Sequence, residues 1–391
     1  KGYLMQNFIY DIPTKIYFGE GQLKELGNLL KNKGKSVLLV YGGGSIKKNG
    51  IYDKVQNILR EHNITCQELS GVEPNPRIDT VRKGISICRE HNLEIVLAIG
   101  GGSTIDCGKV IAAGVHYDGD AWDIVKNGRL STDTLPIIAV PTLAATGSEM
   151  DTFAVISNPE TKDKIGTGHP SMRPVAAILD PTYTYSVNAY HTAAGTADIM
   201  SHIMECYFSN AQGYMQDRMA EALLKTCIQY GTEAIAHPDN YEARANLQWA
   251  SCWAINNLIE LGKEVSWSVH PMEHELSAFY DITHGIGLAI ITPHWMRYVL
   301  SEKTVDKFVS YAINVWNVEP TDDKFEVAEK GIKATEEFFK SCGIPMNLGK
   351  LGIDDSLIEK MARAVIKHAD LSDAYVALNE SDICEILKRS L

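Results

Sequence analysis

The chain of 391 residues contains no apolar run of the roughly 18 residues that a membrane-spanning helix requires. Its apolar stretches, such as Val37–Tyr41 and Ile95–Ile99, have the length of strands. Cationic residues are also in deficit, because 37 Lys and Arg stand against 49 Asp and Glu, which gives a formal net charge of −12. A surface this acidic repels phosphate backbones and anionic lipids. We therefore expect a small molecule as the partner, and neither a nucleic acid nor a membrane.

The eight cysteines include no Cys-x-x-Cys pair, which argues against a thiolate zinc site and against a disulfide framework. The amino terminus also lacks the basic-then-apolar pattern of a signal peptide. Both absences favour reduced, individually buried thiols and a cytoplasmic location. The first residue is Lys1, and we expect the native start near Met5.

The first 180 residues alternate short β-rich runs with amphipathic segments. The runs are Ser36–Tyr41, Ile95–Ile99, Leu135–Val140 and Ala176–Leu179, and the segments between them include Gln22–Lys31, Tyr52–His62 and Ile78–Glu90. Strands separated by helices of this length predict βαβ units and a doubly wound parallel sheet. Long helical patterns follow the Asp180-Pro181 breaker: Thr196–Ser209, Tyr214–Gly231, Tyr241–Leu261 and Lys324–Cys342. We thus predict an α/β dinucleotide-binding domain over residues 1–180 and an all-helical domain over residues 181–391.

Two glycine-rich turns follow predicted strands. Gly100, Gly101, Gly102 and Ser103 come after Glu94–Ile99, and Gly42, Gly43, Gly44 and Ser45 come after Ser36–Tyr41. Glycines at such a position let the backbone approach a pyrophosphate, and the N–H groups of the following helix attract it. A single turn of this kind is often only a tight turn, but two at one sheet edge favour nucleotide binding. Ser103 and Asp106 also fit a capping box at the helix start.

The strand that ends at Tyr41 is followed by glycine, whereas an acid at this point would hold the 2′-hydroxyl of NAD and repel a 2′-phosphate. Ser45, Lys47 and Lys48 lie just downstream. The pattern therefore favours NADP(H) over NAD(H), although the two lysines could equally belong to a solvated turn.

A carboxylate and several histidines recur at helical spacing in the second half. Asp198 and His202 are four residues apart, His270 and His274 are again four apart, and His284 follows ten later. Residues at this spacing share one face of a helix, so they can bind one ion. Lys and Arg are absent from 190–217, and Lys263 alone occurs in 245–296, a depletion that a buried helical core would also show. Carboxylate and imidazole without thiolate suit Fe(II), Zn(II) or a neighbouring first-row ion.

At this point the sequence resembles the iron-containing (group III) alcohol dehydrogenases, in their NAD(P)H-dependent butanol dehydrogenase-like branch. The resemblance runs nearly end to end, and its most specific segments are Tyr41–Gly50, Glu73–Pro76, Gly100–Asp106, Ala197–His202, His270–Ser277 and Asp281–Gly285. It implies a dehydroquinate synthase-like architecture, with a nucleotide-binding α/β domain and a helical domain.

The resemblance also implies the roles of particular residues. The metal ligands would be Asp198, His202, His270 and His284, and the pyrophosphate loop would be Gly100–Ser103 with Asp106. The nicotinamide-side contacts that it implies are Asn75, Thr142, Thr146 and Lys164. Phe153 is a further candidate coenzyme contact, which the resemblance itself does not supply. The Gly42–Ser45 loop is similar to that of members that accept NADP(H). His274 matches a histidine near the nicotinamide and the metal, and we propose it as the proton relay. A homodimer is expected from the family.

The expected reaction is hydride transfer between NAD(P)H and short-chain primary aldehydes or alcohols of the butanal and butanol kind, with the metal polarising the carbonyl. Two alternatives share the architecture: a glycerol or polyol dehydrogenase, and a non-redox enzyme of the dehydroquinate synthase type. The latter needs several cations for its substrate, and the depletion of Lys and Arg in 245–296 argues against it. A catalytically idle binding protein is the alternative from another class. Glu273 stands where other branches carry a small residue, and this departure leaves the identity of the substrate undecided.

Overall fold

The computed structural model describes residues 5–211 and 213–391, so the expectation about Lys1–Leu4 lies outside the described residues. The chain divides into two compact units that are each discontinuous in sequence. The first, here called the α/β unit, comprises Asp11–Val187 and Pro238–Cys252. The second, the helical unit, comprises Asn188–His237, Trp253–Leu391 and the N-terminal segment up to Tyr10. The domain boundary at residue 180 stays a prediction.

The α/β unit is built on one sheet of six parallel strands in the order β1-β8-β5-β4-β2-β3. These strands are β1 (Lys15–Phe18), β2 (Ser36–Tyr41), β3 (Thr65–Leu69), β4 (Ile95–Gly100), β5 (Ile137–Pro141) and β8 (Ala176–Leu179). The predicted doubly wound parallel sheet is confirmed. The predicted strands all form, and β1 and β3 join them at the two edges, where half-exposed residues weaken the apolar signal.

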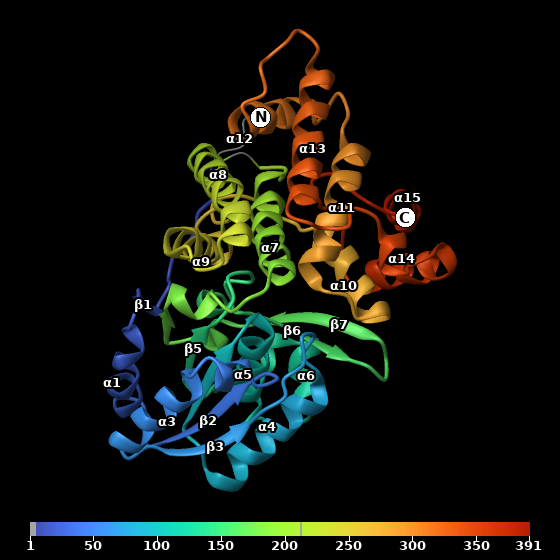
Figure 1. Cartoon of the computed structure of the whole chain (residues 1–391). Coiled ribbons are helices and arrows are strands. Elements are labelled where there is room, and N and C mark those ends of the chain that lie inside the picture. Colours follow the sequence, from blue (N-terminus) through green and yellow to red (C-terminus); the bar gives the residue numbers. More distant parts are fainter. Residues whose placement is uncertain (1–4, 212) are drawn as a thin grey trace. The chain divides into compact units, whose positions relative to one another are not determined.

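The neighbouring interior strands β2 and β4 are buried on both faces of the sheet. Their register pairs Val37 with Ile95 and Tyr41 with Ile99. A strand covered on both sides needs apolar residues at every position, which explains why these two segments read as continuous apolar runs. Figure 1 shows the helices of this unit distributed around the sheet.

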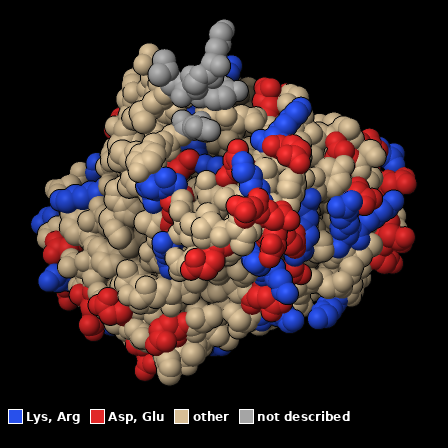
Figure 2. Space-filling model, turned by 90° about the horizontal axis from the view of Figure 1, so that it is seen from above, with Lys and Arg blue, Asp and Glu red and all other residues tan. Residues whose placement is uncertain are grey.

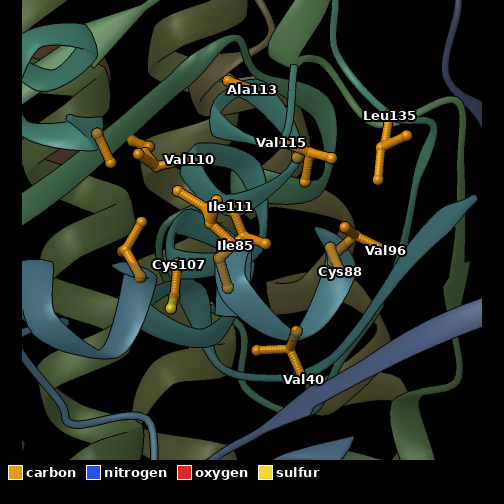
Figure 3. Close-up of a cluster of buried hydrophobic side chains, with 14 of the residues drawn as sticks. Val40, Ile85, Cys88, Val96, Cys107, Val110, Ile111, Ala113, Val115 and Leu135 are labelled. Carbon is orange, nitrogen blue, oxygen red and sulfur yellow. The ribbon is translucent and has the colours of Figure 1, made fainter. Parts of the chain in front are cut away.

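Helices cover both faces of this sheet. They are α1 (Leu26–Lys31), α2 (Ser45–Lys48), α3 (Ile51–Glu61), α4 (Ile78–His91), α5 (Gly102–Gly114) and α6 (Ala121–Lys126). Val40 and Val96 point to one side, where Figure 3 shows them packed with Ile85 of α4 and with Ile111 of α5. The alternate residues of β2 and β4 pack on the other side with α1 and α3. The sheet is therefore a rigid support for the loops at its ends.

A two-stranded antiparallel hairpin, which the sequence analysis did not anticipate, follows the sheet strand β5. It consists of β6 (Phe153–Asn158) and β7 (Asp163–Gly168). Lys162 adopts a left-handed conformation with φ of 55° in the connecting turn. No Asn-Gly or Asp-Gly pair, the usual hairpin signal, marks this turn in the sequence.

The second half of the chain is helical, as predicted. Its helices are α7 (Ala189–Tyr207), α8 (Tyr214–Ala236), α9 (Tyr241–Ile255), α10 (Val269–Tyr280), α11 (His284–Val299), α12 (Val305–Trp316), α13 (Lys324–Ser341), α14 (Ile358–His368) and α15 (Glu380–Arg389). α7 begins seven residues before the predicted start, because the Asn188 side chain accepts the backbone N–H of His191 and caps it. α9 ends six residues early, and Asn257 just beyond it has a left-handed φ of 71°.

No helix in the described part of the chain is both long and apolar enough to cross a membrane. On the face drawn in Figure 2, the Lys and Arg side chains of the described residues are interspersed with Asp and Glu. Opposite charges therefore alternate on that face.

Gly285 provides a test of how closely α7 and α11 approach. A Cβ atom at Gly285 would overlap the backbone carbonyl of Ala194, so a side chain forces the two helices apart. We expect Gly285→Ala to reduce the free energy of unfolding by about 1–3 kcal/mol, measured by thermal and urea denaturation. Gly166→Ala is the control, because its Cβ would meet Val155 at 3.9 Å, an ordinary contact. Equal stability of both variants would show that the helices do not touch at this point.

Candidate functional site

One face of α7 carries three buried side chains with polar ends. Asp198, His202 and Glu205 stand at positions i, i+4 and i+7, which lie in one stripe along a helix. The spacing of the first two was the basis of the predicted metal site. Glu205 continues the same stripe, and the sequence analysis did not single it out.

Four predicted metal ligands, all in the helical unit, are brought together by three helices. His270 lies in the first turn of α10, and His284 is the first residue of α11. The Nε2 atoms of His202, His270 and His284 lie 3.3, 3.7 and 3.7 Å from the Oδ1 atom of Asp198. One carboxylate oxygen is thus surrounded by three imidazole nitrogens.

The distances from the Asp198 oxygen fit a shared metal ion, and the ligand atoms of Asp198, His202 and His270 lie within 4.8 Å of one another. Ligand atoms bound tetrahedrally at about 2.1 Å are about 3.4 Å apart. Asp198 Oδ1 and His270 Nε2 are buried and have no hydrogen-bond partner among the described residues. Such unsatisfied buried groups cost free energy, and a metal ion would remove that cost. One carboxylate with three imidazoles suits Fe(II) or Zn(II). The assignment of these residues as ligands stays a prediction.

The carboxylate of Glu205 fixes both the start of α10 and the orientation of His270. It accepts the backbone N–H groups of Ser268, Val269 and His270 at 2.8–2.9 Å. It also accepts the Nδ1–H of His270 at 3.2 Å. With the proton on Nδ1, the lone pair of His270 is on Nε2 and directed toward Asp198.

Glu273 holds His284 in the same way. This fully buried carboxylate contacts Nδ1 of His284 with one oxygen and accepts the hydroxyl of Ser277 with the other. The sequence analysis noted Glu273 only as a departure from other branches. Its position three residues after His270 placed it near the site, but only the folded α10 and α11 show that it orients His284.

The charges around the site favour a bound cation. Burial raises the pKa of Asp198, but His202 and the other imidazoles outweigh it and hold the pKa well below its usual range. Burial lowers the pKa of His202 to about 3, so this imidazole is neutral, as a metal ligand must be. Lys263, the one Lys or Arg in the sequence from 245 to 296, donates its hydrogen bonds to the carbonyl of Cys206 and to Asp217. The charged side chains nearest to the histidines are three buried carboxylates, Asp198, Glu205 and Glu273.

His274 lies beside this group. Its ring centroid is 5.6 Å from that of His284 and 6.2 Å from that of His270. One of its nitrogens lies within 4.8 Å of ligand atoms of Glu273 and His284. His274 is half-buried, so it retains access that the buried histidines lack.

The predicted nucleotide loops lie in the α/β unit at the carboxyl ends of three neighbouring strands. The turn Gly42–Ser45 follows β2, the turn Gly100–Ser103 follows β4, and the loop Thr142–Thr146 follows β5. The pairing of Gly100 with Pro141 and of Tyr41 with Ile99 sets these loops side by side. Parallel α/β sheets bind ligands outside this edge.

Several glycines of these loops lie so close to neighbouring side chains that a Cβ atom would not fit. A Cβ at Gly100 would lie 2.5 Å from the Thr104 hydroxyl, and one at Gly102 would collide with Thr146. Gly44 has a φ of 101°, in the left-handed region that favours glycine. The turn Gly100–Ser103 leads directly into the 13-residue helix α5, which no side chain caps, so the N–H groups at its start can attract an anion. These residues fit the pyrophosphate of a dinucleotide.

The predicted capping box at α5 is wrong. The N-cap residue is Gly101, and no side chain caps the helix. The Ser103 hydroxyl donates instead to the carbonyl of Pro74, and Asp106 accepts the hydroxyl of Ser148 at 2.6 Å and the N–H of Val155 at 2.9 Å. Capping geometry needs a helix that starts at Thr104, but this helix starts two residues earlier.

A buried lysine, which the sequence analysis missed, holds the loop that follows β5. The ammonium of Lys109 donates to Ser148 Oγ at 2.8 Å, Asp151 Oδ1 at 2.5 Å and the carbonyl of Phe153 at 2.7 Å. A lone lysine in the apolar helix α5 was the available signal. The network fixes the path of the chain from the loop into the hairpin.

The other candidate coenzyme residues differ in exposure. Asn75 and Lys164 are buried, and Lys164 lies on β7. Phe153 is exposed at the start of β6. These residues belong to the α/β unit, as the loops do. Their roles in coenzyme binding stay predictions.

A parallel sheet with glycine-rich turns and a buried carboxylate–imidazole cluster are features of metal-dependent dehydrogenases. Two family models match the chain. "Iron-containing alcohol dehydrogenase" matches residues 13–181, and "Fe-containing alcohol dehydrogenase family, C-terminal" matches residues 192–391.

Curated relatives cover nearly the whole chain. "NADH-dependent butanol dehydrogenase A" of Clostridium acetobutylicum is 57% identical over 99% of this chain and 100% of its own length. "NADPH-dependent aldehyde reductase YqhD" of Escherichia coli is 37% identical over 93% of this chain and 94% of its own length. The crystal structure of a protein named NADH-dependent butanol dehydrogenase A from Thermotoga maritima superposes with a TM-score of 0.94 at 37% identity, covering 99% of both chains.

The chain therefore belongs to the iron-containing alcohol dehydrogenase family, in its butanol dehydrogenase branch, and is an oxidoreductase. Membership of this family implies a nicotinamide coenzyme and a divalent metal ion.

The two orienting carboxylates lead to a prediction about metal affinity. We expect Glu205→Gln and Glu273→Gln each to weaken Fe(II) or Zn(II) binding by about 10- to 100-fold, because each loses the carboxylate that directs a histidine. Competition with a chelator of known affinity measures this directly. Glu264→Gln is the control, since that carboxylate is exposed and accepts only from Gln6 among the hydrogen bonds described here. Unchanged affinity in both variants would show that the histidines orient themselves.

Proposed function

We propose that this chain catalyses hydride transfer between NAD(P)H and short-chain primary aldehydes and alcohols, with one Fe(II) or Zn(II) ion bound by Asp198, His202, His270 and His284. The observation that carries the proposal is the convergence of three imidazole Nε2 atoms on one carboxylate oxygen within 3.7 Å. Relatives that are 57% and 54% identical are named butanol dehydrogenases, which supports the substrate class.

The chain's own residues prepare the site. Asp198 supplies a carboxylate oxygen, and the histidines supply imidazole nitrogens. Glu205 and Glu273 hold two of those rings with their Nδ1 atoms bonded, so that Nε2 remains available. Trp267 packs against His202 and His270, with centroid distances of 5.4 and 4.5 Å, and gives that side of the site an apolar wall. When bound, the metal ion supplies a Lewis acid for the carbonyl oxygen, and the coenzyme supplies the hydride.

The sequence pattern and the names of the relatives point to different coenzymes. The sequence pattern after β2 favours NADP(H), but the relatives at 57% and 54% identity are named NADH-dependent, so their names give that preference no support. The relative named NADPH-dependent is 37% identical. We propose NADH as the preferred coenzyme.

Two further expectations belong to this proposal. A homodimer is supported by β1, an edge strand that pairs with β8 on one side and can pair with a second copy on the other. A cytoplasmic location is supported by the eight cysteines, which are all free thiols.

The proposed reaction is tested by the initial rate of NADH and NADPH oxidation with butanal. We expect chelation to lower the rate at least about 100-fold, because the Lewis acid is lost, and anaerobic addition of Fe(II) or Zn(II) to restore it. Asp198→Asn is the control that should not recover with either metal. Glycerol, assayed in the oxidative direction, tests the polyol alternative. A rate that survives complete chelation, or coenzyme binding without butanal reduction, would refute the proposal.

His274 is proposed as the group that carries the proton, because it is the half-buried imidazole beside the four ligands. We expect His274→Ala to lower kcat by about 100-fold while the protein retains one metal ion per chain. Metal content and kcat are measured on the same preparation, with His191→Ala, an exposed histidine of α7, as the control. Parallel loss of metal and activity would make His274 a ligand and not a relay.

A further inference from the structure

A carboxylate lies beside the end of β2 although the sequence shows none on that strand. Glu68 belongs to the neighbouring strand β3, and the register pairs it with Leu39 of β2. The hydroxyl of Tyr41, the last residue of β2, donates to Glu68 Oε2 at 2.7 Å. Figure 1 shows β2 and β3 adjacent in the sheet, with α3 beside them.

Glu68 also accepts two donors from α3. The Tyr52 hydroxyl donates to Oε1 at 2.5 Å, and the Gln56 amide donates to the same oxygen at 3.2 Å. The bond to Glu68 raises the pKa of Tyr52 to about 12, so this phenol remains a donor at physiological pH. Three side-chain donors therefore hold the carboxylate in one position.

The same cluster holds Lys47, one of the two lysines that follow the Gly42–Ser45 turn. Its ammonium lies 4.6 Å from the ring centroid of Tyr52 and 5.4 Å from that of Tyr41, which is the geometry of a cation–π contact. The two rings meet edge to face at 5.9 Å. The hydrogen bond with Tyr41 and the charge of Glu68 raise the pKa of Lys47. Lys47 and Glu68 thus form a cluster without net charge, tied together by two tyrosines.

The cluster lies where it can influence recognition of the adenosine ribose. The strand end beside the pyrophosphate turn is where a dinucleotide's adenosine ribose is recognised, and here β2 lies directly beside β4. A 2′-phosphate adds a charge of about −1.5 to −2, which nearby cations attract. The ammonium of Lys47 lies against the two tyrosine rings, and the negative charge of Glu68 acts on it. An unphosphorylated 2′-hydroxyl carries no charge to be repelled by Glu68.

We propose that Glu68, acting through Tyr41, Tyr52 and Lys47, is a specificity-determining residue that makes the chain prefer NADH to NADPH. It does so by placing a negative charge beside the lysine that would otherwise attract the 2′-phosphate more strongly. This inference rests on the proposed function, since it requires that the α/β unit binds a nicotinamide dinucleotide. It replaces the sequence-based reason for NADP(H), because the acid is supplied by the adjacent strand.

Dissociation constants of the full-length protein test the proposal without reference to turnover. NADH, NADPH, 5′-AMP and adenosine 2′,5′-bisphosphate are titrated by calorimetry into the wild type and into Glu68→Gln. We expect the wild type to bind NADH more tightly. In Glu68→Gln, the ratio of the NADPH constant to the NADH constant should fall about 2- to 5-fold, the size of one exposed charge interaction. The two adenosine probes should show the same change.

Further variants separate specificity from stability. Tyr52→Phe keeps the ring but removes one bond to Glu68, so it should shift the ratio in the same direction by a smaller factor. Adding Lys47→Met to Glu68→Gln should reverse the shift, because the effect passes through Lys47. Glu61→Gln, an exposed carboxylate at the end of α3, is the control and should leave the ratio unchanged.

The outcomes distinguish the two proposals. A wild type that binds both dinucleotides but shows no change of ratio in Glu68→Gln would overturn the role of Glu68 and leave the proposed function intact. An equal loss of affinity for NADH and NADPH would also overturn it, because that result means a structural role for the cluster. A wild type that binds neither dinucleotide would refute the proposed function and, with it, this inference.

Discussion

A carboxylate cannot remain ionised in a protein interior without positive charge or hydrogen-bond donors beside it, and Asp198 is such a carboxylate. Three imidazole nitrogens surround its Oδ1 atom, and two of those imidazoles are held from behind by Glu205 and Glu273. α7, α10 and α11 each contribute at least one member of this arrangement. A divalent cation would supply positive charge for three buried carboxylates that lie among these imidazole rings.

The candidate sites in the two units would bind groups of opposite charge, a metal cation in one and a pyrophosphate in the other. The helical unit gathers carboxylates and imidazoles around a point where a cation can be held. The α/β unit has to accept a pyrophosphate in a chain whose net charge is −12. The proposed pyrophosphate site there consists of backbone N–H groups at the start of α5 and of glycines that allow close approach, rather than of a cluster of lysines. Lys109, the buried lysine of that helix, is used to anchor a loop.

Because backbone groups supply the attraction, few side chains remain to distinguish one coenzyme from another. Lys47 and Glu68 are charged groups close to the end of β2, and the two tyrosines hold them together. In the proposal, these few charges distinguish NADPH from NADH by its 2′-phosphate. In the proposal above, a cluster at the edge of the sheet therefore influences coenzyme choice although it contains none of the glycine-rich turns.

The amino-acid sequence by itself determined the elements whose signals are local. Continuous apolar runs specified β2 and β4, helical spacing placed Asp198 beside His202, and the motif segments identified the family. Glu205, Glu273 and Glu68 acquired their roles only in the tertiary structure. Their partners come from other helices and strands, such as His270, 65 residues beyond Glu205, and no local pattern encodes such a contact. Periodicity reports which face of an element is buried, whereas the fold decides which side chains meet there.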